Sequence, residues 1–302
     1  MRVGVTGATG FLGRALVDAL HERGDEVVRF VRPSSPAAPG PIVRWDPARG
    51  DLDHDALASW GGFDAVVNLA GTGIATHRWS PSYRAGVKTS RTAATTLLVE
   101  ALTTLTAGVA VLVSGSAIGY YGDRGEEVLT EASGVGHDYV AEVCRDWEAA
   151  ATPLASTGTN VALLRTGIVM GRDGGVLERL VPLFRAGLGG VIGSGRQWMS
   201  PVSLRDQVAA MLWIIDHRLS GPVNVTAPEP CTNRELTRAL ARALHRPALV
   251  RVPSLALKVA LGTELAANTV LTSQRVVPRA LEESGFRFGA RDVAAVVASA
   301  LT

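Results

Sequence analysis

The sequence has few cysteines, no metal-binding spacing and almost no net charge. Two cysteines, Cys144 and Cys231, are too few for a disulfide framework, and the six histidines form neither an HExxH nor a CxxC-paired pattern, so we expect no metal. A formal charge of +2 without a basic block argues against a nucleic-acid partner. No apolar run reaches the roughly 18 residues of a membrane span, and the N-terminus lacks the layout of a signal peptide. We therefore expect no membrane association and a cytoplasmic location.

A hydrophobic content of 47% in 302 residues is enough to bury a sizeable core. Short apolar runs alternate with longer segments of helical period, which is typical of an α/β fold with a parallel sheet covered by helices. The predicted strands are residues 2–6, 26–31, 65–69, 109–114, 161–165 and 223–226. They predict a doubly wound sheet over residues 1–228, with a loop-rich, glycine-rich insertion at the cleft over 171–204. Residues 229–302, with prolines between amphipathic stretches, predict a small, mainly helical C-terminal lobe on the substrate side.

Three glycines follow the first predicted strand in the run V-T-G-A-T-G-F-L-G-R-A-L-V. Gly7 permits a tight turn, Gly10 lets the backbone approach a pyrophosphate, and Gly13 allows close packing of the helix whose N-terminus faces the anion. Because strand, spacing and helix coincide, the run predicts a Rossmann-type dinucleotide site, and the absence of a following lysine argues against a Walker-type site. The other residues of the run that we expect at the cofactor are Thr9, Phe11 and Leu12.

The second predicted strand ends in Arg32, where an acidic side chain would bind the adenosine ribose of NAD. Glu26 lies at the opposite end of that strand. A guanidinium at the tip offers a forked, permanently charged partner for a 2′-phosphate. We therefore expect NADP(H) rather than NAD(H); the alternative is that Arg32 is a solvent-exposed arginine near a strand end.

Multi-residue motifs along nearly the whole chain carry a resemblance to a known superfamily. With N-L-A-G at 68–71 and S-G-S-A-I-G-Y-Y-G at 114–122, the sequence resembles extended short-chain dehydrogenases/reductases. The runs A-E-V-C-R-D-W-E, L-R-T-G-I-V-M-G, G-S-G-R-Q-W-M-S and G-P-V-N-V-T-A-P-E-P are similar to epimerase-family proteins described as nucleoside-diphosphate-sugar epimerases or SulA-like proteins. The run S-Q-R-V-V-P-R-A-L-E-E-S-G-F-R-F resembles the small domain that ends those chains.

The resemblance implies an NADP(H)-binding Rossmann fold in which Ser116 matches the catalytic serine. It also implies that Leu69, Ala70 and Gly71 run beside the cofactor and that Ser114 and Gly115 lie beneath the nicotinamide. Separately, Thr166 and Gly167 follow a strand end, at the carboxyl edge where ligands bind in such sheets.

The segment D-Y-V-A-E-V-C-R-D-W-E, residues 138–148, departs from the superfamily. The resemblance places Val140 and Cys144 where other members carry a tyrosine and a lysine. Lowering a tyrosine pKa from about 10 to about 7 requires roughly 4 kcal/mol, and no cation at helical spacing from Tyr139 supplies it. Tyr139 is therefore a candidate only as a neutral proton donor, which suits reduction by NADPH. The alternative is that this helix is purely structural, with an apolar stripe facing the core.

Two further segments offer substrate-binding residues. Tyr120 and Tyr121 lie in a glycine-flanked turn, and Arg196 and Trp198 lie in the run G-S-G-R-Q-W-M-S, which suits an anionic or planar ligand. For each segment the alternative is simple packing. No G-x-S-x-G elbow surrounds Ser116, so a serine hydrolase is not expected.

Together these patterns predict an NADP(H)-dependent oxidoreductase of the atypical extended type, reducing a small carbonyl-type substrate by hydride transfer with Ser116 polarising the acceptor oxygen. One alternative is a non-catalytic NADP(H)-binding sensor or regulatory protein, and another is a nucleotide-sugar epimerase- or dehydratase-like enzyme. The expected partner is a small-molecule substrate, and a homodimer is left open.

Overall fold

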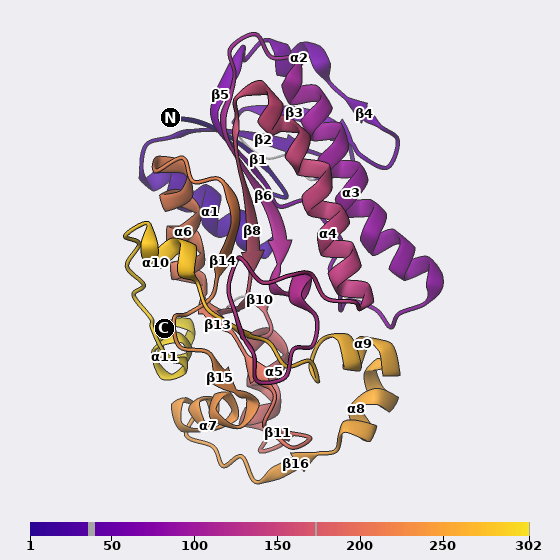
Figure 1. Cartoon of the computed structure of the whole chain (residues 1–302), viewed down its shortest axis with the longest axis vertical. Helices are drawn as coiled ribbons and strands as arrows, with labels where there is room; N and C mark the ends of the chain where they lie inside the picture. Colours follow the sequence, from indigo (N-terminus) through magenta and orange to yellow (C-terminus); the bar gives the residue numbers. More distant parts are fainter. Residues whose placement is uncertain (36–39, 173, 302) are drawn as a thin grey trace.

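The computed structural model describes residues 1–35, 40–172 and 174–301. Residue 173 of the expected insertion and residue 302 of the expected lobe lie outside the described residues. An eight-stranded sheet runs through the upper part of the molecule in Figure 1, and the C-terminal elements gather mainly below and beside it. In spatial order its strands are β14 (Gly221–Val225), β8 (Asn160–Thr166), β6 (Gly108–Ala117), β5 (Gly62–Asn68), β1 (Arg2–Thr6), β2 (Glu26–Val31), β3 (Ile42–Asp46) and β4 (Asp51–Leu52).

All neighbouring strands of this sheet are parallel except β3 and β4. All six predicted strands belong to it, so the predicted doubly wound parallel sheet is confirmed. β3 and β4 extend it beyond the prediction.

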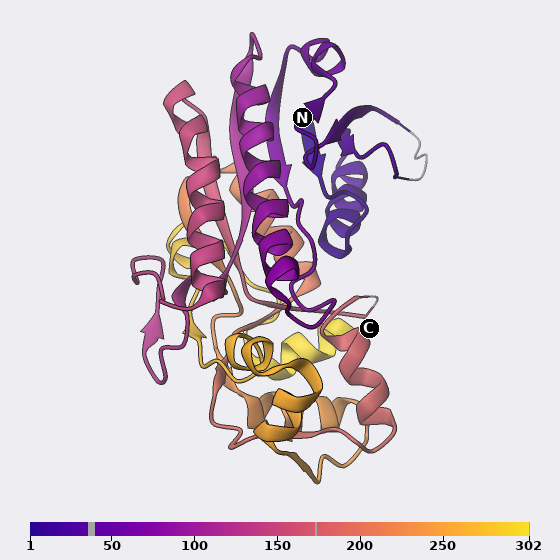
Figure 2. The same ribbon diagram turned by 90° about the vertical axis from the view of Figure 1, so that its right-hand side faces the viewer.

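Helices cover both faces of the sheet. On one face α1 (Phe11–Glu22) and α6 (Leu204–Asp216) pack on valines of β1, β5 and β6. On the other face lie α3 (Pro81–Thr103) and α4 (Tyr139–Ala151), which run side by side in Figure 2. Among the described residues, no helix is both long and apolar enough to cross a membrane.

Local caps set the starts of the two helices that border the site. The Ser80 hydroxyl accepts a hydrogen bond from the amide of Tyr83, and Pro81 occupies the first position of α3, where its missing N–H is not needed. The Asp138 carboxylate accepts a bond from the amide of Ala141 and begins α4. Short elements complete this part: α2 (His54–Ala58), η1 (Ile118–Tyr121), β7 (Val128–Leu129) and η2 (Thr152–Thr157).

The segment 171–204 is more ordered than the expected loop-rich insertion. It and its flanks contain β9 (Ile168–Gly171), β10 (Gly174–Gly175), α5 (Leu177–Arg185), β11 (Gly190–Ile192), β12 (Trp198–Met199) and β13 (Pro201–Ser203). The leucine and phenylalanine spacing of α5 gives it an apolar face, and Leu177 and Phe184 are buried. The glycines of this segment serve turns between elements rather than one long loop.

The C-terminal part is mainly helical, as predicted. Its elements are β15 (Cys231–Thr232), α7 (Asn233–Ala243), β16 (Val250–Val252), α8 (Ser254–Leu261), α9 (Thr263–Asn268), β17 (Arg275–Val276), α10 (Arg279–Glu283) and α11 (Val293–Leu301). Leu236 and Val296 share a core with Leu177 and Phe184 of α5, whereas Leu281 and Phe286 pack into the sheet core beside α6. The C-terminal elements therefore pack against both α5 and the sheet core, and the domain boundary expected at residue 228 stays a prediction.

Candidate cofactor and active site

A groove of about 700 Å³ lies beside the ends of β1, β2, β3 and β5. It brings together the predicted cofactor residues Gly7, Thr9, Gly10, Arg32, Leu69, Ala70 and Gly71. Its other lining residues include Trp45, Asp46, Thr72 and Ser90, which sequence reasoning missed. Trp45 and Asp46 were missed because β3, a short strand with alternating charges, was not predicted.

The glycine turn is shaped to receive a phosphate. Gly7 has φ +65°, and a methyl group added there would lie 2.6 Å from the carbonyl oxygen of Leu69. At Gly13 an added methyl would lie 2.1 Å from the carbonyl oxygen of Gly7. α1 begins after Gly10 without any side-chain cap, so its N-terminal dipole and amides are available to an anion. These features fit a dinucleotide pyrophosphate.

Arg32 supplies a positive charge at the same groove. It is exposed, and within the described ranges no carboxylate pairs with it. Glu26, at the far end of β2, is paired with Arg2 at 2.8 Å and cannot serve a ribose in the groove. Asp46 of β3 also faces the groove and accepts a hydrogen bond from the amide of Ala48 at 3.2 Å. The groove therefore offers an exposed guanidinium for a phosphate.

Phe11 and Leu12 do not line this groove, which differs from their predicted role. The Phe11 ring lies so close to Gly174 that a methyl there would be 2.5 Å from the ring, and it also packs on Gly171. The side chain of Phe11, at the first position of α1, thus packs this helix against β9 and β10. Leu12 is half-buried on the same turn.

A chain of hydrogen bonds joins the ends of β1 and β5 to α3 and α4, below the expected position of the nicotinamide. The Thr6 hydroxyl donates to Asn68 (2.7 Å), while the Asn68 amide and the Trp147 indole both donate to the hydroxyl of Thr95, at 2.8 and 3.0 Å. Trp147 also fills the space that a side chain at Gly115 would occupy, 2.6 Å from an added methyl. Ser114, Gly115, Thr166 and Gly167 are not among the lining residues of the groove.

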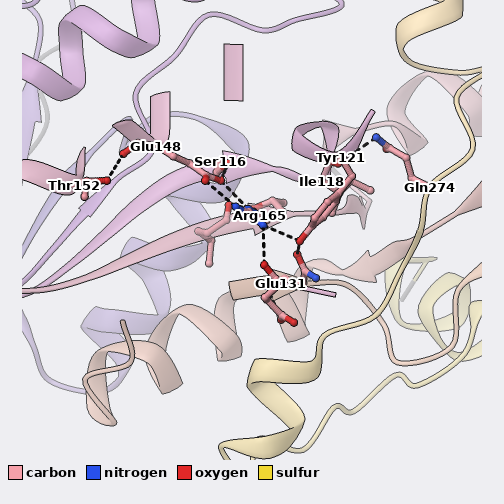
Figure 3. A network of polar contacts seen from close by, with 11 residues as sticks. Ser116, Ile118, Tyr121, Glu131, Glu148, Thr152, Arg165 and Gln274 are labelled. Atoms are coloured by element: carbon pink, nitrogen blue, oxygen red, sulfur yellow. Dashed lines mark hydrogen bonds and ion pairs between the residues drawn. The ribbon is translucent and has the colours of Figure 1, made fainter. Parts of the chain in front are cut away.

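Ser116 belongs to a buried polar network, shown in Figure 3. Its hydroxyl donates to one oxygen of Glu148 at 2.6 Å, and Arg165 donates to both oxygens of that carboxylate at 2.8 and 2.9 Å. Glu148 is 6% exposed and Arg165 3% exposed. Burial opposes the charge of Arg165, but its bonds to Glu148 raise its pKa above the ordinary value. The Ser116 hydroxyl thus donates its one hydrogen to the Glu148 carboxylate, and its oxygen can still accept a hydrogen bond.

Tyr121 is a packing residue, which corrects its predicted place in the cleft. It is 0% exposed, its hydroxyl donates to Asn224 at 2.6 Å, and it accepts a bond from Arg165 at 3.0 Å. Burial raises the pKa of Tyr121 to about 12. Tyr120 is half-buried, and its ring lies under the guanidinium of Arg165 at 3.5 Å. Both rings therefore support the buried ion pair.

The hydroxyl of Tyr139 forms its hydrogen bond with α3 and not with Ser116. Its hydroxyl donates to the backbone carbonyl of Arg84 on α3, and its ring packs against Trp79 at 5.2 Å. Burial raises the pKa of Tyr139. Cys144 is buried against η1, and burial raises the pKa of its thiol to about 12. The hydroxyl of Tyr139 is thus engaged within the protein, and its role as a proton donor stays a prediction.

Gln274 joins the loop of Arg196 and Trp198 to η1, the turn that follows the strand of Ser116. Gln274 donates its side-chain amide to the carbonyl of Ile118 at 3.1 Å, and its backbone amide donates to the carbonyl of Trp198 at 3.0 Å. The Trp198 indole donates to Glu126 at 2.6 Å, while Arg196 is exposed. The substrate-binding role of Arg196 stays a prediction, and the indole nitrogen of Trp198 is occupied by its bond to Glu126.

Thr166 and Gly167 lie where β8 passes to the next segment. A methyl at position 167 would lie 2.4 Å from the carbonyl oxygen of Ser200, so glycine is required by close backbone packing. The Thr166 hydroxyl accepts a weak bond from Gln207 at 3.4 Å. Both residues support the edge of the sheet.

Comparison with known proteins finds two family models and several relatives that match this chain. The family model described as "NAD dependent epimerase/dehydratase family" matches residues 3–226, and a domain of unknown function, DUF1731, matches residues 252–300. Epimerase family protein ML0860 of Mycobacterium leprae is 42% identical over 95% of this chain and 91% of its own length. The chloroplastic SDR39U1 homolog of Arabidopsis thaliana is 38% identical over 95% of this chain and 83% of its own.

Solved structures show the same fold. The human epimerase family protein SDR39U1, solved with NADPH, matches with a TM-score of 0.90 and 31% identity over 100% of this chain and 99% of its own. A nucleoside-diphosphate sugar epimerase from Corynebacterium glutamicum matches with a TM-score of 0.80 and 35% identity, over 100% of this chain and 58% of its own.

Proposed function

The chain belongs to the NAD dependent epimerase/dehydratase family, and from this premise we propose that it is an NADP(H)-dependent oxidoreductase that reduces a small carbonyl-type substrate. The observation that carries the proposal is the groove in which the Gly7 turn and the exposed Arg32 lie together. The human relative was solved with NADPH, which supports the same cofactor. When bound, that cofactor supplies a hydride.

The chain's own residues would bind and orient the reactants. The uncapped start of α1 receives the pyrophosphate and Arg32 receives the 2′-phosphate. Ser116 is the candidate to polarise the acceptor oxygen, and for this its proton turns from Glu148 toward the substrate. Glu148 keeps its two bonds from Arg165, so exchange of this one hydrogen bond leaves the ion pair in place.

The first test concerns cofactor choice. Replacing Arg32 with alanine is expected to weaken NADPH binding by about 10- to 100-fold, because a charge-assisted bond to the 2′-phosphate contributes roughly 1.5–3 kcal/mol. NADH affinity should not change, since NADH lacks that phosphate. Fluorescence titration of both nucleotides measures the ratio. Arg287→Ala, which removes the same charge from an exposed site outside the groove, is the control. Equal affinity of the unaltered protein for both nucleotides would refute the assignment.

The second test concerns turnover. With NADPH and a panel of carbonyl compounds, replacing Ser116 with alanine is expected to lower kcat by about 100-fold or more, at the lower end of what a positioned proton donor contributes. NADPH affinity should remain, because Ser116 does not line the groove. The rate of loss of NADPH absorbance measures turnover, and Ser220→Ala on the exposed surface is the control. An unchanged kcat in the Ser116 variant would remove that residue from the mechanism.

A second candidate is a non-catalytic NADP(H)-binding sensor. The observation that favours it is that the hydroxyls of Ser116, Tyr121 and Tyr139 are all engaged as donors within the protein. Tight NADPH binding without NADPH oxidation by any member of the carbonyl panel would support this candidate over the reductase.

A further inference from the structure

Arg91 of α3 is a cation for which the described residues supply no acidic partner, and it lies half-buried close to the cofactor groove. Its guanidinium donates from Nη1 to the carbonyl of Val87, one turn earlier on the same helix, at 3.0 Å. Burial lowers the pKa of this guanidinium. Taking a charge out of water without pairing it opposes folding, so an arginine in this state needs an explanation beyond stability.

The neighbouring cations of α3 show what Arg91 lacks. Arg84 pairs with Glu264 at 2.9 Å, and Lys88 pairs with Glu142 and Asp146 of α4 at 2.6 and 2.7 Å. These bases follow one side of the helix at spacings of four and three residues. At the next position along that side, α4 offers Arg91 the ring of Trp147 and the thiol of Cys144 instead of a carboxylate.

The guanidinium lies between the ring of Trp147 and Gly71, a residue that lines the groove. Its carbon lies 5.1 Å from the Trp147 ring centre and 3.4 Å from the position of a methyl on Gly71. Trp147 is itself fixed by its bond to Thr95. Arg91 is not itself among the residues that line the groove, but Gly71, which its guanidinium approaches, and Ser90, its neighbour in the chain, both line it. The guanidinium therefore lies at the border of the groove.

The position along the groove indicates which part of a dinucleotide Arg91 meets. The adenosine end is marked by Arg32 and Trp45, and the pyrophosphate by Gly7. Arg91 lies between Gly71 and Trp147, and Trp147 covers Gly115 beside the strand of Ser116. That is the path toward the reacting end of the ligand.

We propose that Arg91 is a cofactor-binding residue that donates hydrogen bonds to oxygens of the nicotinamide nucleotide half of NADP(H), its ribose hydroxyls or its phosphate. The inference rests on the proposed function. It assigns to α3 a guanidinium that fixes the half of the cofactor carrying the hydride, whereas Arg32 fixes the other half. The planar, forked guanidinium can donate to the two hydroxyls of a ribose or to two oxygens of a phosphate. Both candidate groups therefore present a pair of acceptor oxygens.

The experiment compares three ligands by calorimetry: NADPH, 2′-phospho-ADP, which lacks the second ribose, and adenosine 2′,5′-bisphosphate, which lacks the second phosphate as well. Replacing Arg91 with methionine is expected to weaken NADPH binding about 10- to 100-fold and to leave adenosine 2′,5′-bisphosphate unchanged. Loss of 2′-phospho-ADP binding as well identifies the phosphate, and its retention identifies the ribose. Arg32→Ala is the matched variant and should weaken all three ligands.

A purely structural role gives a different result. Methionine keeps the packing of the aliphatic stem and removes an unpaired charge, so the thermal midpoint of Arg91→Met should stay the same or rise. Arg91→Lys, which keeps the charge but loses the fork, should show an intermediate loss of NADPH affinity. A lower midpoint with equal weakening of all ligands, or unchanged NADPH binding, overturns the inference. Failure of the unaltered protein to bind NADPH overturns the proposed function itself.

Discussion

Replacing Glu148 with alanine is expected to destabilise the protein by about 3–5 kcal/mol, because it leaves the charge of Arg165 buried without its carboxylate. The pair is nearly inaccessible to water, and Glu148 also holds the hydroxyl of Ser116. Urea unfolding at neutral pH measures the loss as a fall in midpoint at constant slope. Such a loss would remove much of the stability of a typical domain.

Two further variants separate the buried charge from other effects. Glu283 is paired with Arg279 at 3.4 Å on the surface, and both side chains are largely exposed, so Glu283→Ala should cost less than about 1 kcal/mol. The double variant Glu148→Leu with Arg165→Met removes both charges and should recover most of the lost stability, since an apolar pair of similar volume is often neutral. A single Glu148 variant no less stable than Glu283→Ala would contradict this account.

The sheet and the glycine turn could be predicted from the sequence because each has a local signal. Short apolar runs marked the six strands from β14 to β2, and the spacing of Gly7, Gly10 and Gly13 marked the phosphate turn. β3 lacked such a signal, because Arg44 and Asp46 interrupt its apolar residues on an outer part of the sheet. Asp46 and Trp45 were missed with it.

The polar interior of the site could not be predicted, because its partners are far apart in the chain. Arg165 stands in an apolar strand pattern, and nothing local shows that Glu148, seventeen residues earlier, neutralises it. Tyr121 was predicted at the cleft from its turn, yet its hydroxyl binds Asn224 across 103 residues. Such pairings follow from the packing of β8, α4 and β14.

The cation beside α4 could not be predicted for a similar reason. The resemblance placed Cys144 where other members carry a lysine, and no helical spacing on α4 supplied a substitute. The guanidinium of Arg91 reaches the same surroundings from α3, fifty-three residues earlier in the chain. Only the side-by-side packing of α3 and α4, visible in Figure 2, brings it there.

Replacing Gly13 with alanine is expected to weaken NADPH binding by at least about 100-fold, equivalent to roughly 2.8 kcal/mol, and to lower stability by about 1–3 kcal/mol. The added methyl would lie 2.1 Å from the carbonyl oxygen of Gly7 and 2.8 Å from the Cα of Ala8, which are backbone atoms that cannot rotate away. Relief requires α1 to move from the turn that receives the pyrophosphate. Calorimetric titration and urea unfolding measure the two effects.

Two other glycines distinguish a shifted helix from a blocked ligand. At Gly10, which has φ −75°, an added methyl meets only the Gly7 oxygen at 3.2 Å, so Gly10→Ala should keep the fold and impair only the approach of the phosphate. Gly134 has no atom within 4 Å of an added methyl, and its alanine variant should change neither property. If Gly13→Ala bound NADPH as well as Gly134→Ala does, the close packing of α1 on the Gly7 turn would not be what forms the pyrophosphate site.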